Sequence, residues 1–150
     1  MTESGINHAE LREAALRLLA RREHSYLELV HKLTRRGWPE AEVEALVDEL
    51  AGENLQSDER FAESYVRSRV ARHYGPIRIR AELGERGIDR VLAERILREQ
   101  EVDWFGLAAD WYQRRYGTQP AAEDLRERSR RQQALARRGF AHEHVRELFD

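Results

Sequence analysis

LTRRGWPEAEVEALV, residues 33–47, is the stretch that decides the fold, because its pattern occurs twice more, as LGERGIDRVLAERIL at 83–97 and as LARRGFAHEHVRELF at 135–149. Each copy begins with a leucine, has a glycine four residues later, and continues with a large apolar residue. Apolar residues also occupy the positions six, nine and ten after the glycine in all three copies. The glycines are 50 and then 52 residues apart, so the sequence predicts three tandem copies of one structural unit.

Each unit is predicted to contain three short helices. Apolar residues spaced three and four apart flank each glycine, which is typical of helices that bury one face. Gly37, Gly87 and Gly139 are expected in the left-handed conformation that ends a helix. Ser25 and Glu28 fit a capping box at the start of another helix. Further helices are expected to begin at Asn7, Pro39, Ser57, Pro76, Asp89, Asp103 and Pro120, and two to end at Gly75 and Gly117.

The predicted fold is all-α, with three tandem helix-turn-helix-like repeats of three helices each. About nine helices should form an elongated, curved array. We expect the repeats to occupy residues 1–54, 55–101 and 102–150. One unit of this size has a thin core, so neighbouring units must pack against each other. The helix from Pro120 to Gly139 is expected to be longer than its counterparts, because the third repeat holds extra residues there.

Nothing in the composition or the motifs points to catalysis or to a bound cofactor. The chain has no cysteine, which excludes disulfides and thiolate chemistry. Its glycines stand mostly singly as helix ends, and none belongs to a phosphate-binding loop after a strand. His142 and His144 are two residues apart on an expected helix, so they point to different faces and do not chelate a metal together. We therefore expect no enzyme activity, no cofactor and no metal site.

No targeting or membrane segment is expected either. The first ten residues lack the apolar run of a signal peptide, and no stretch of the chain has the length of apolar sequence that spans a bilayer. We therefore expect a soluble cytoplasmic protein, monomeric and without contact to a membrane.

Charge is segregated along the chain, although the net charge is only −2. Residues 37–59 contain eight acidic residues and no Lys or Arg, whereas residues 64–81 contain five Arg and no acid. A second basic stretch covers residues 126–138. One such arginine alone is typical of a solvated helix face, but clustered guanidinium groups favour contact with phosphates or an acidic protein surface. The candidate contact residues are Arg67, Arg69, Arg72, Arg78, Arg80, Arg130, Arg131, Arg137 and Arg138.

A helix-turn-helix DNA reader would insert the third helix of a unit into the major groove. In the first repeat that helix is strongly acidic, so phosphates would repel it. The equivalent helices of the other two repeats are mixed in charge. The units are therefore better interpreted as scaffolding for other contacts. Four aromatic residues of the third repeat are expected mainly in its core, with stacking of nucleic-acid bases as the alternative: Trp104, Trp111, Tyr112 and Tyr116.

Four segments resemble the RecX family, small bacterial proteins that regulate the recombinase RecA. They are LRLLARREHSYLELVHKLTRRG at 16–37, LQSDERFAESYVRSR at 55–69, YGPIRIRAELGERGI at 74–88 and RRQQALARRGF at 130–140. The resemblance covers almost the whole chain. Tyr26 departs from the family, which often has an arginine after this serine, and residues 118–127 match the family poorly.

The resemblance implies a regulatory protein without catalytic activity. RecX proteins bind the RecA filament on single-stranded DNA, lie in its helical groove, inhibit ATP hydrolysis and strand exchange, and promote disassembly. The expected partner is therefore the RecA filament, including the single-stranded DNA within it, and the expected setting is recombination, DNA repair and the SOS response. Two alternatives stay open: a helix-turn-helix-type regulator that binds DNA directly, and an α-repeat adaptor that binds only proteins.

Overall fold

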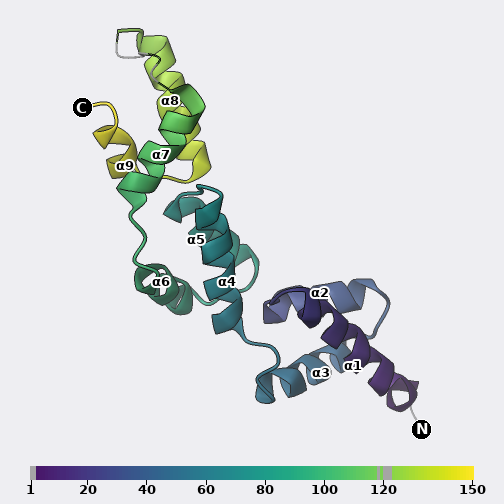
Figure 1. Cartoon of the computed structure of the whole chain (residues 1–150). Helices are drawn as coiled ribbons and strands as arrows, with labels where there is room; N and C mark the ends of the chain where they lie inside the picture. Colours follow the sequence, from purple (N-terminus) through teal and green to yellow (C-terminus); the bar gives the residue numbers. More distant parts are fainter. Residues whose placement is uncertain (1–2, 118, 120–122) are drawn as a thin grey trace.

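The computed structural model describes residues 3–117, 119 and 123–150, and this part of the chain folds into nine α-helices without any β-strand (Figure 1). The helices are α1 (Glu3–Arg21), α2 (Tyr26–Arg35), α3 (Glu40–Gly52), α4 (Asp58–Ala71), α5 (Pro76–Glu85), α6 (Arg90–Glu99), α7 (Trp104–Tyr116), α8 (Leu125–Arg138) and α9 (His142–Glu147). None of these described helices has the length and apolar character needed to cross a membrane. The all-α fold that the sequence predicts is confirmed.

The helices form three groups of three, each with its own buried core, and the groups follow one another along an elongated molecule (Figure 1). The repeated leucines Leu33, Leu83 and Leu135 are completely buried, one in each core. The apolar residue that follows each glycine packs in the same core: Trp38, Ile88 and Phe140. The repeat in the sequence thus corresponds to three separate hydrophobic cores.

Neighbouring groups share side chains at their borders. Trp104, the first residue of α7, packs against the core of the second group rather than the core of its own group. We therefore keep the repeat boundaries at 1–54, 55–101 and 102–150 as a proposal about the extent of each unit.

Most helix ends have the expected chemistry. The Ser25 hydroxyl accepts a hydrogen bond from the Glu28 N–H, and the Glu28 carboxylate accepts one from the Ser25 N–H, each at 3.1 Å, which completes the capping box. Gly37, Gly87 and Gly139 have φ angles of 104°, 79° and 104°, a backbone conformation that glycine adopts readily and that other residues disfavour. Side chains also cap α4, α6 and α7 at the predicted residues, Ser57, Asp89 and Asp103.

Two expected helix boundaries in the first half of the chain are wrong. α1 already begins at Glu3, so Asn7 lies within this helix rather than at its start. α4 ends at Ala71 rather than at Gly75. The reason is that His73 itself adopts the left-handed φ of 64° that a glycine was expected to supply.

The expected start of the eighth helix is also wrong. α8 begins at Leu125, where the Asp124 carboxylate accepts hydrogen bonds from the first backbone N–H groups. Pro120, the expected start, lies outside the described residues. The prediction that this helix is longer than its counterparts is confirmed, because α8 has 14 residues while α2 and α5 have 10 each.

Polar contacts join the first group to the second. The backbone N–H of Tyr26, at the start of α2, donates to Oδ1 of Asp58 at the start of α4, over 2.8 Å. The Arg60 guanidinium pairs with the Glu23 carboxylate at 2.9 Å. A carboxylate beside a helix N-terminus satisfies a free N–H group and complements the helix dipole. The two N-terminal ends therefore fix the angle between these groups.

The second and third groups meet through their backbones. The N–H of Gly75 donates to the carbonyl oxygen of Arg138, and the N–H of Ile77 donates to the carbonyl oxygen of Gly139, both over 2.9 Å. The N-terminus of α5 thus meets the C-terminus of α8. Free N–H groups of one helix satisfy free carbonyl groups of the other, and helix-dipole ends of opposite sign face each other.

Lowering the pH from about 7.5 to about 5.5 is expected to destabilise the first group through its buried His24. The Nδ1 atom of His24 lies 3.1 Å from the carbonyl oxygen of Arg22, and its Nε2 atom lies 3.0 Å from Nζ of Lys32. A carbonyl group only accepts and an ammonium group only donates, so the ring is neutral with its proton on Nδ1. Burial, together with the Arg22 and Lys32 charges, lowers the pKa of His24. The stability from the neutral ring is therefore complete above the unfolded pKa of about 6.5 and is lost as the pH falls from there through the lower pKa of the folded state.

Urea unfolding of the wild type and of His24→Gln at both pH values measures this contribution. The wild type should lose more free energy of unfolding on acidification than the variant does. His31→Gln, a change of an exposed histidine on the adjacent helix α2, should lose as much free energy of unfolding on acidification as the wild type does. Equal losses in the wild type and in His24→Gln would rule out this residue as the source.

Candidate nucleic-acid interface

The nine candidate arginines lie in different environments. Three are exposed, and no carboxylate among the described residues pairs with their side chains: Arg67, Arg72 and Arg137. Five pair with glutamates: Arg69 and Arg78 with Glu82, Arg80 with Glu94, and Arg130 and Arg131 with Glu127. The basic stretches of the sequence are therefore partly neutralised, by Glu127 within the second stretch and by Glu82 and Glu94, which follow the first.

Arg131 is removed from the candidate surface, because it is only 2% exposed. Its guanidinium donates to the Glu127 carboxylate, to the Tyr112 hydroxyl and to the carbonyl oxygen of Gln119. These three acceptors occupy the side chain inside the third group. The arginine-rich pattern of α8 does not reveal this, because Tyr112 reaches it from α7.

Arg138 connects the second and third groups. Its guanidinium donates to the carbonyl oxygens of Arg72 and His73, which follow the end of α4. These carbonyl groups belong to the helix C-terminus and its turn, where a positive charge is favourable. Arg138 is half-buried, so part of the group stays open to the surface.

A cleft of about 450 Å³ opens where these two groups meet, and we call it the C-terminal cleft. Its lining consists of Arg78, Trp111, Arg115, Ala134, Arg137 and Arg138, with no carboxylate among them. The cleft thus draws together arginines from α5, α7 and α8, which are far apart in the sequence. Of the nine candidates, it unites Arg78, Arg137 and Arg138, whereas Arg67, Arg80 and Arg130 do not line it.

Tyr74 lies at the centre of the arginines behind this cleft. The guanidinium carbons of Arg69, Arg138 and Arg78 lie 3.7, 3.9 and 4.6 Å from the centroid of its ring. The negative face of an aromatic ring attracts such cations and holds them in place. Burial alone would raise the pKa of Glu82, but hydrogen bonds from Arg69, Tyr65 and Arg78 lower it, so this carboxylate stays ionised and balances part of the charge.

Sequence reasoning missed Arg115 as a candidate and placed Trp111 mainly in the core. Arg115 is exposed, and no carboxylate of the described residues pairs with it. The only signal was its position in the last turn of an expected helix, which is common for basic residues. Trp111 packs partly against the third core and also lines the cleft. Clustered guanidinium groups beside an indole suit phosphates, with bases or sugars against the ring.

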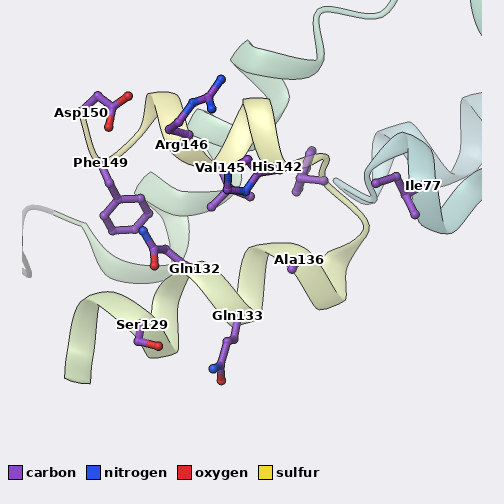
Figure 2. Close-up of a pocket in the computed structure, with 11 residues that line it drawn as sticks. Ile77, Ser129, Gln132, Gln133, Ala136, His142, Val145, Arg146, Phe149 and Asp150 are labelled. Carbon is purple, nitrogen blue, oxygen red and sulfur yellow. The ribbon is translucent and has the colours of Figure 1, made fainter. Parts of the chain in front are cut away.

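A second, more apolar groove of about 560 Å³ lies between α8 and α9 (Figure 2). Figure 2 shows Ser129, Gln132 and Gln133 along α8, with Val145 and Phe149 on the facing segment. This groove holds no pair of carboxylates and no nucleophile placed beside a base. In the part of the chain that the structure describes, no three His, Asp or Glu side chains form a group that could hold a metal ion.

Three domain models of one protein family match this chain in order. The matches are "RecX, first three-helix domain" over residues 12–50, "RecX, second three-helix domain" over residues 57–97, and "RecX, third three-helix domain" over residues 101–149. The order and spacing of the matches correspond to the three cores of the structure.

Curated relatives and solved structures agree with these matches. The regulatory protein RecX of Halorhodospira halophila is 46% identical over 146 residues, which cover 97% of this chain and 90% of the relative. That of Pseudomonas entomophila is 43% identical, with 93% and 94% covered. A crystal structure titled as regulatory protein RecX superposes with a TM-score of 0.79 at 27% identity, covering 96% of this chain and 72% of that one. The crystal structure of RecX from Lactobacillus salivarius, at 23% identity, shows the same fold with a TM-score of 0.75 over 95% and 94% of the two chains. This chain therefore belongs to the RecX family of regulatory proteins.

Proposed function

We propose that this protein binds the RecA filament on single-stranded DNA and inhibits the ATPase, recombinase and coprotease activities of RecA. Membership of a family whose relatives are named regulatory proteins supports a regulatory role without catalysis. RecA is the partner that the family resemblance implies. The setting is recombination, DNA repair and the SOS response, in the cytoplasm, with a monomer as the binding unit.

The C-terminal cleft is the observation that carries this proposal. A concave surface lined by four guanidinium groups and no carboxylate concentrates positive potential and attracts anions. Guanidinium forks bind phosphate and carboxylate groups through paired hydrogen bonds. A nucleoprotein filament offers phosphates from its DNA and carboxylates from its protein, so the cleft suits such a partner.

The elongated shape supports binding to a repeating partner. Three rigid groups in a row can each contact a different part of a filament, and several weak contacts in one molecule add to a strong one. α3, the third helix of the first group, exposes Glu40, Glu44 and Asp48. DNA phosphates would repel these acids, which argues against insertion of α3 into the major groove. In this proposal α3 faces a basic protein surface or the solvent.

Arg115→Glu combined with Arg137→Glu is expected to weaken inhibition of the RecA ATPase on single-stranded DNA. The concentration needed for half-inhibition should rise by about tenfold or more, because two attractive charge-assisted contacts become repulsive. If both arginines contact phosphates, the slope of log affinity against log salt should fall by about 1.4, or about 0.7 per contact. These two residues are preferable to Arg78 and Arg80, whose charges are already paired with glutamates.

A matched control is Arg90→Glu with Arg98→Glu, which makes the same change of charge at exposed positions of α6 outside the cleft. This control should inhibit like the wild type, and circular dichroism should show unchanged helix content in both variants. If wild-type protein leaves ATP hydrolysis by the filament unchanged, the proposed function is wrong. If the wild type inhibits and the cleft variant inhibits equally well, the interface lies elsewhere.

A further inference from the structure

A second arginine-rich cleft lies between the first and second groups, and we call it the N-terminal cleft. It has a volume of about 410 Å³. Its charged lining residues are Arg22, Glu23, Glu28, Arg69, Arg72 and Arg86. Glu23 is neutralised by Arg60 from outside the cleft, at 2.9 Å. Glu28 is shared between Arg22 at 3.1 Å and Arg86 at 3.6 Å, so the lining keeps an excess of positive charge.

The two clefts are connected by alternating arginine and aromatic side chains, which we call the ladder. It begins in the N-terminal cleft, where the Arg86 and Arg69 guanidinium carbons lie 4.8 and 5.8 Å from the Tyr65 ring centroid. Arg69 and Arg138 then lie 3.7 and 3.9 Å from the Tyr74 ring.

The ladder ends in the C-terminal cleft, where Arg138 lies 5.7 Å from the Trp111 ring. Arg72, which lines the N-terminal cleft, also accepts a hydrogen bond from Arg138 through its carbonyl group. Glu82 pairs with Arg69 in the middle of the ladder, at 2.7 Å, and neutralises this arginine. One series of cation–π contacts therefore links the cleft at the first junction between groups to the cleft at the second.

We propose that the two clefts and the ladder form one track for the sugar–phosphate backbone of a single-stranded nucleic acid. This track rests on the function proposed above and adds one detail to it: the arginines contact the DNA strand rather than RecA. A strand in this track contacts Arg22 and Arg72 in the N-terminal cleft and Arg115 and Arg137 in the C-terminal cleft.

The chemistry of the track favours a strand over an acidic protein surface. Phosphates repeat at every nucleotide, so one flexible chain can enter two concave sites in series. A folded protein instead presents its carboxylates at fixed positions on a mostly convex surface. The hydroxyl groups of Ser64 and Ser68 in the N-terminal cleft add neutral donors of the kind that bind phosphate oxygens. Trp111, which is half-buried and lines the C-terminal cleft, offers a base or sugar an aromatic contact.

The ladder fixes the arginines that lie between these contact residues, Arg69, Arg78 and Arg138, before the strand arrives. Each guanidinium that rests on a ring or on Glu82 has lost its conformational freedom during folding, so less entropy is lost on binding. Tyr74 is the positioning residue of this arrangement, since it touches three guanidinium groups and itself lies between the clefts. The ring of Tyr74 holds these arginines. Among the described residues, none of the hydrogen bonds that fix them involves the Tyr74 hydroxyl group.

Binding of fluorescein-labelled oligo(dT) of increasing length, without RecA, tests the track. Affinity should rise with length until the strand spans both clefts and then level off. With a long oligonucleotide, Arg72→Glu and the pair Arg115→Glu/Arg137→Glu should each weaken binding by about tenfold or more, and the combination should reduce it to the level of a short oligonucleotide. Tyr74→Leu should weaken binding similarly, while Tyr74→Phe should restore the wild-type affinity because it keeps the ring.

Several outcomes would overturn the track. They are affinity that does not depend on length, long-strand binding that is unchanged in the cleft variants, equal losses in Tyr74→Phe and Tyr74→Leu, and equally strong competition by poly-glutamate of the same charge. The last outcome would assign the arginines to an acidic protein. RecA ATPase inhibition measured with the same variants separates the two proposals: intact inhibition with no oligo(dT) binding overturns only the track, and absent inhibition by the wild type overturns the proposed function.

Discussion

Gly75→Ala is expected to undock the third group of helices from the second. A Cβ atom at this position would lie 2.3 Å from the carbonyl carbon and oxygen of Gly139 and 2.4 Å from the backbone nitrogen of Phe140. All three are backbone atoms, so no side chain can rotate away. Overpacking of this kind costs about 1–3 kcal/mol, and here the two interhelical hydrogen bonds at this contact are strained as well, so we expect about 3 kcal/mol.

Hydrogen exchange shows where this free energy is lost. Amides of α7, α8 and α9 should exchange faster in Gly75→Ala, while those of α1, α2 and α3 should keep their protection. The variant should also lose inhibition of RecA, because the C-terminal cleft exists only while α5 and α8 are docked.

Gly84→Ala is the matched control for this change. Gly84 lies in α5, the helix that follows Gly75, and a Cβ atom there would meet nothing within 4 Å. The substitution should stabilise the protein by about 0.5–1 kcal/mol, because alanine loses less backbone entropy than glycine in a helix. Equal stability of Gly75→Ala and the wild type would mean that the two groups do not meet through this contact in solution.

Leu83→Ala is expected to destabilise the second group by about 3–5 kcal/mol, because it removes a completely buried side chain and leaves a cavity. The three cores are separate, so most of this loss should stay local. The three tryptophans of the chain allow this to be measured, since Trp38, Trp104 and Trp111 pack against the first, second and third cores.

Variants that retain a single tryptophan, with the other two changed to phenylalanine, report each core by fluorescence during urea unfolding. The transition seen by Trp104 should move to lower urea by more than the one seen by Trp38. Leu33→Ala should reverse this order, since it lies in the first core. If every tryptophan shifts equally in both variants, the groups unfold as one cooperative unit.

The repeat could be predicted from sequence because its causes are local. Leu83 and Ile88 flank a glycine with positive φ, and the positions six, nine and ten residues beyond that glycine fall on one face of the next helix. Such patterns depend on helix period and backbone conformation within a few residues. The predicted end of α4 and the predicted start of α8 are wrong for local reasons too. His73 adopts a conformation expected of glycine, and Asp124 caps α8 in a segment where the repeat is irregular.

The candidate site could be predicted only in part. Clusters of arginine in the sequence located the basic regions, but pairing decides how much charge remains. Arg69 meets Glu82 on another helix, and Arg131 meets Tyr112 from α7, so one is neutralised and the other is buried. Arg115 gave no strong signal because the other arginines of the cleft come from other helices.

The sequence by itself determined the three-helix units, their cores and the family to which the chain belongs, because burial of one helix face depends on spacing along the chain. Only the tertiary structure decided which arginines share a surface. That arrangement depends on the close approach of Gly75 to Gly139, two glycines from different repeats whose missing side chains let two helix ends meet. Helix period says nothing about this contact, since it joins backbones 64 residues apart and sets the angle at which one unit docks on the next.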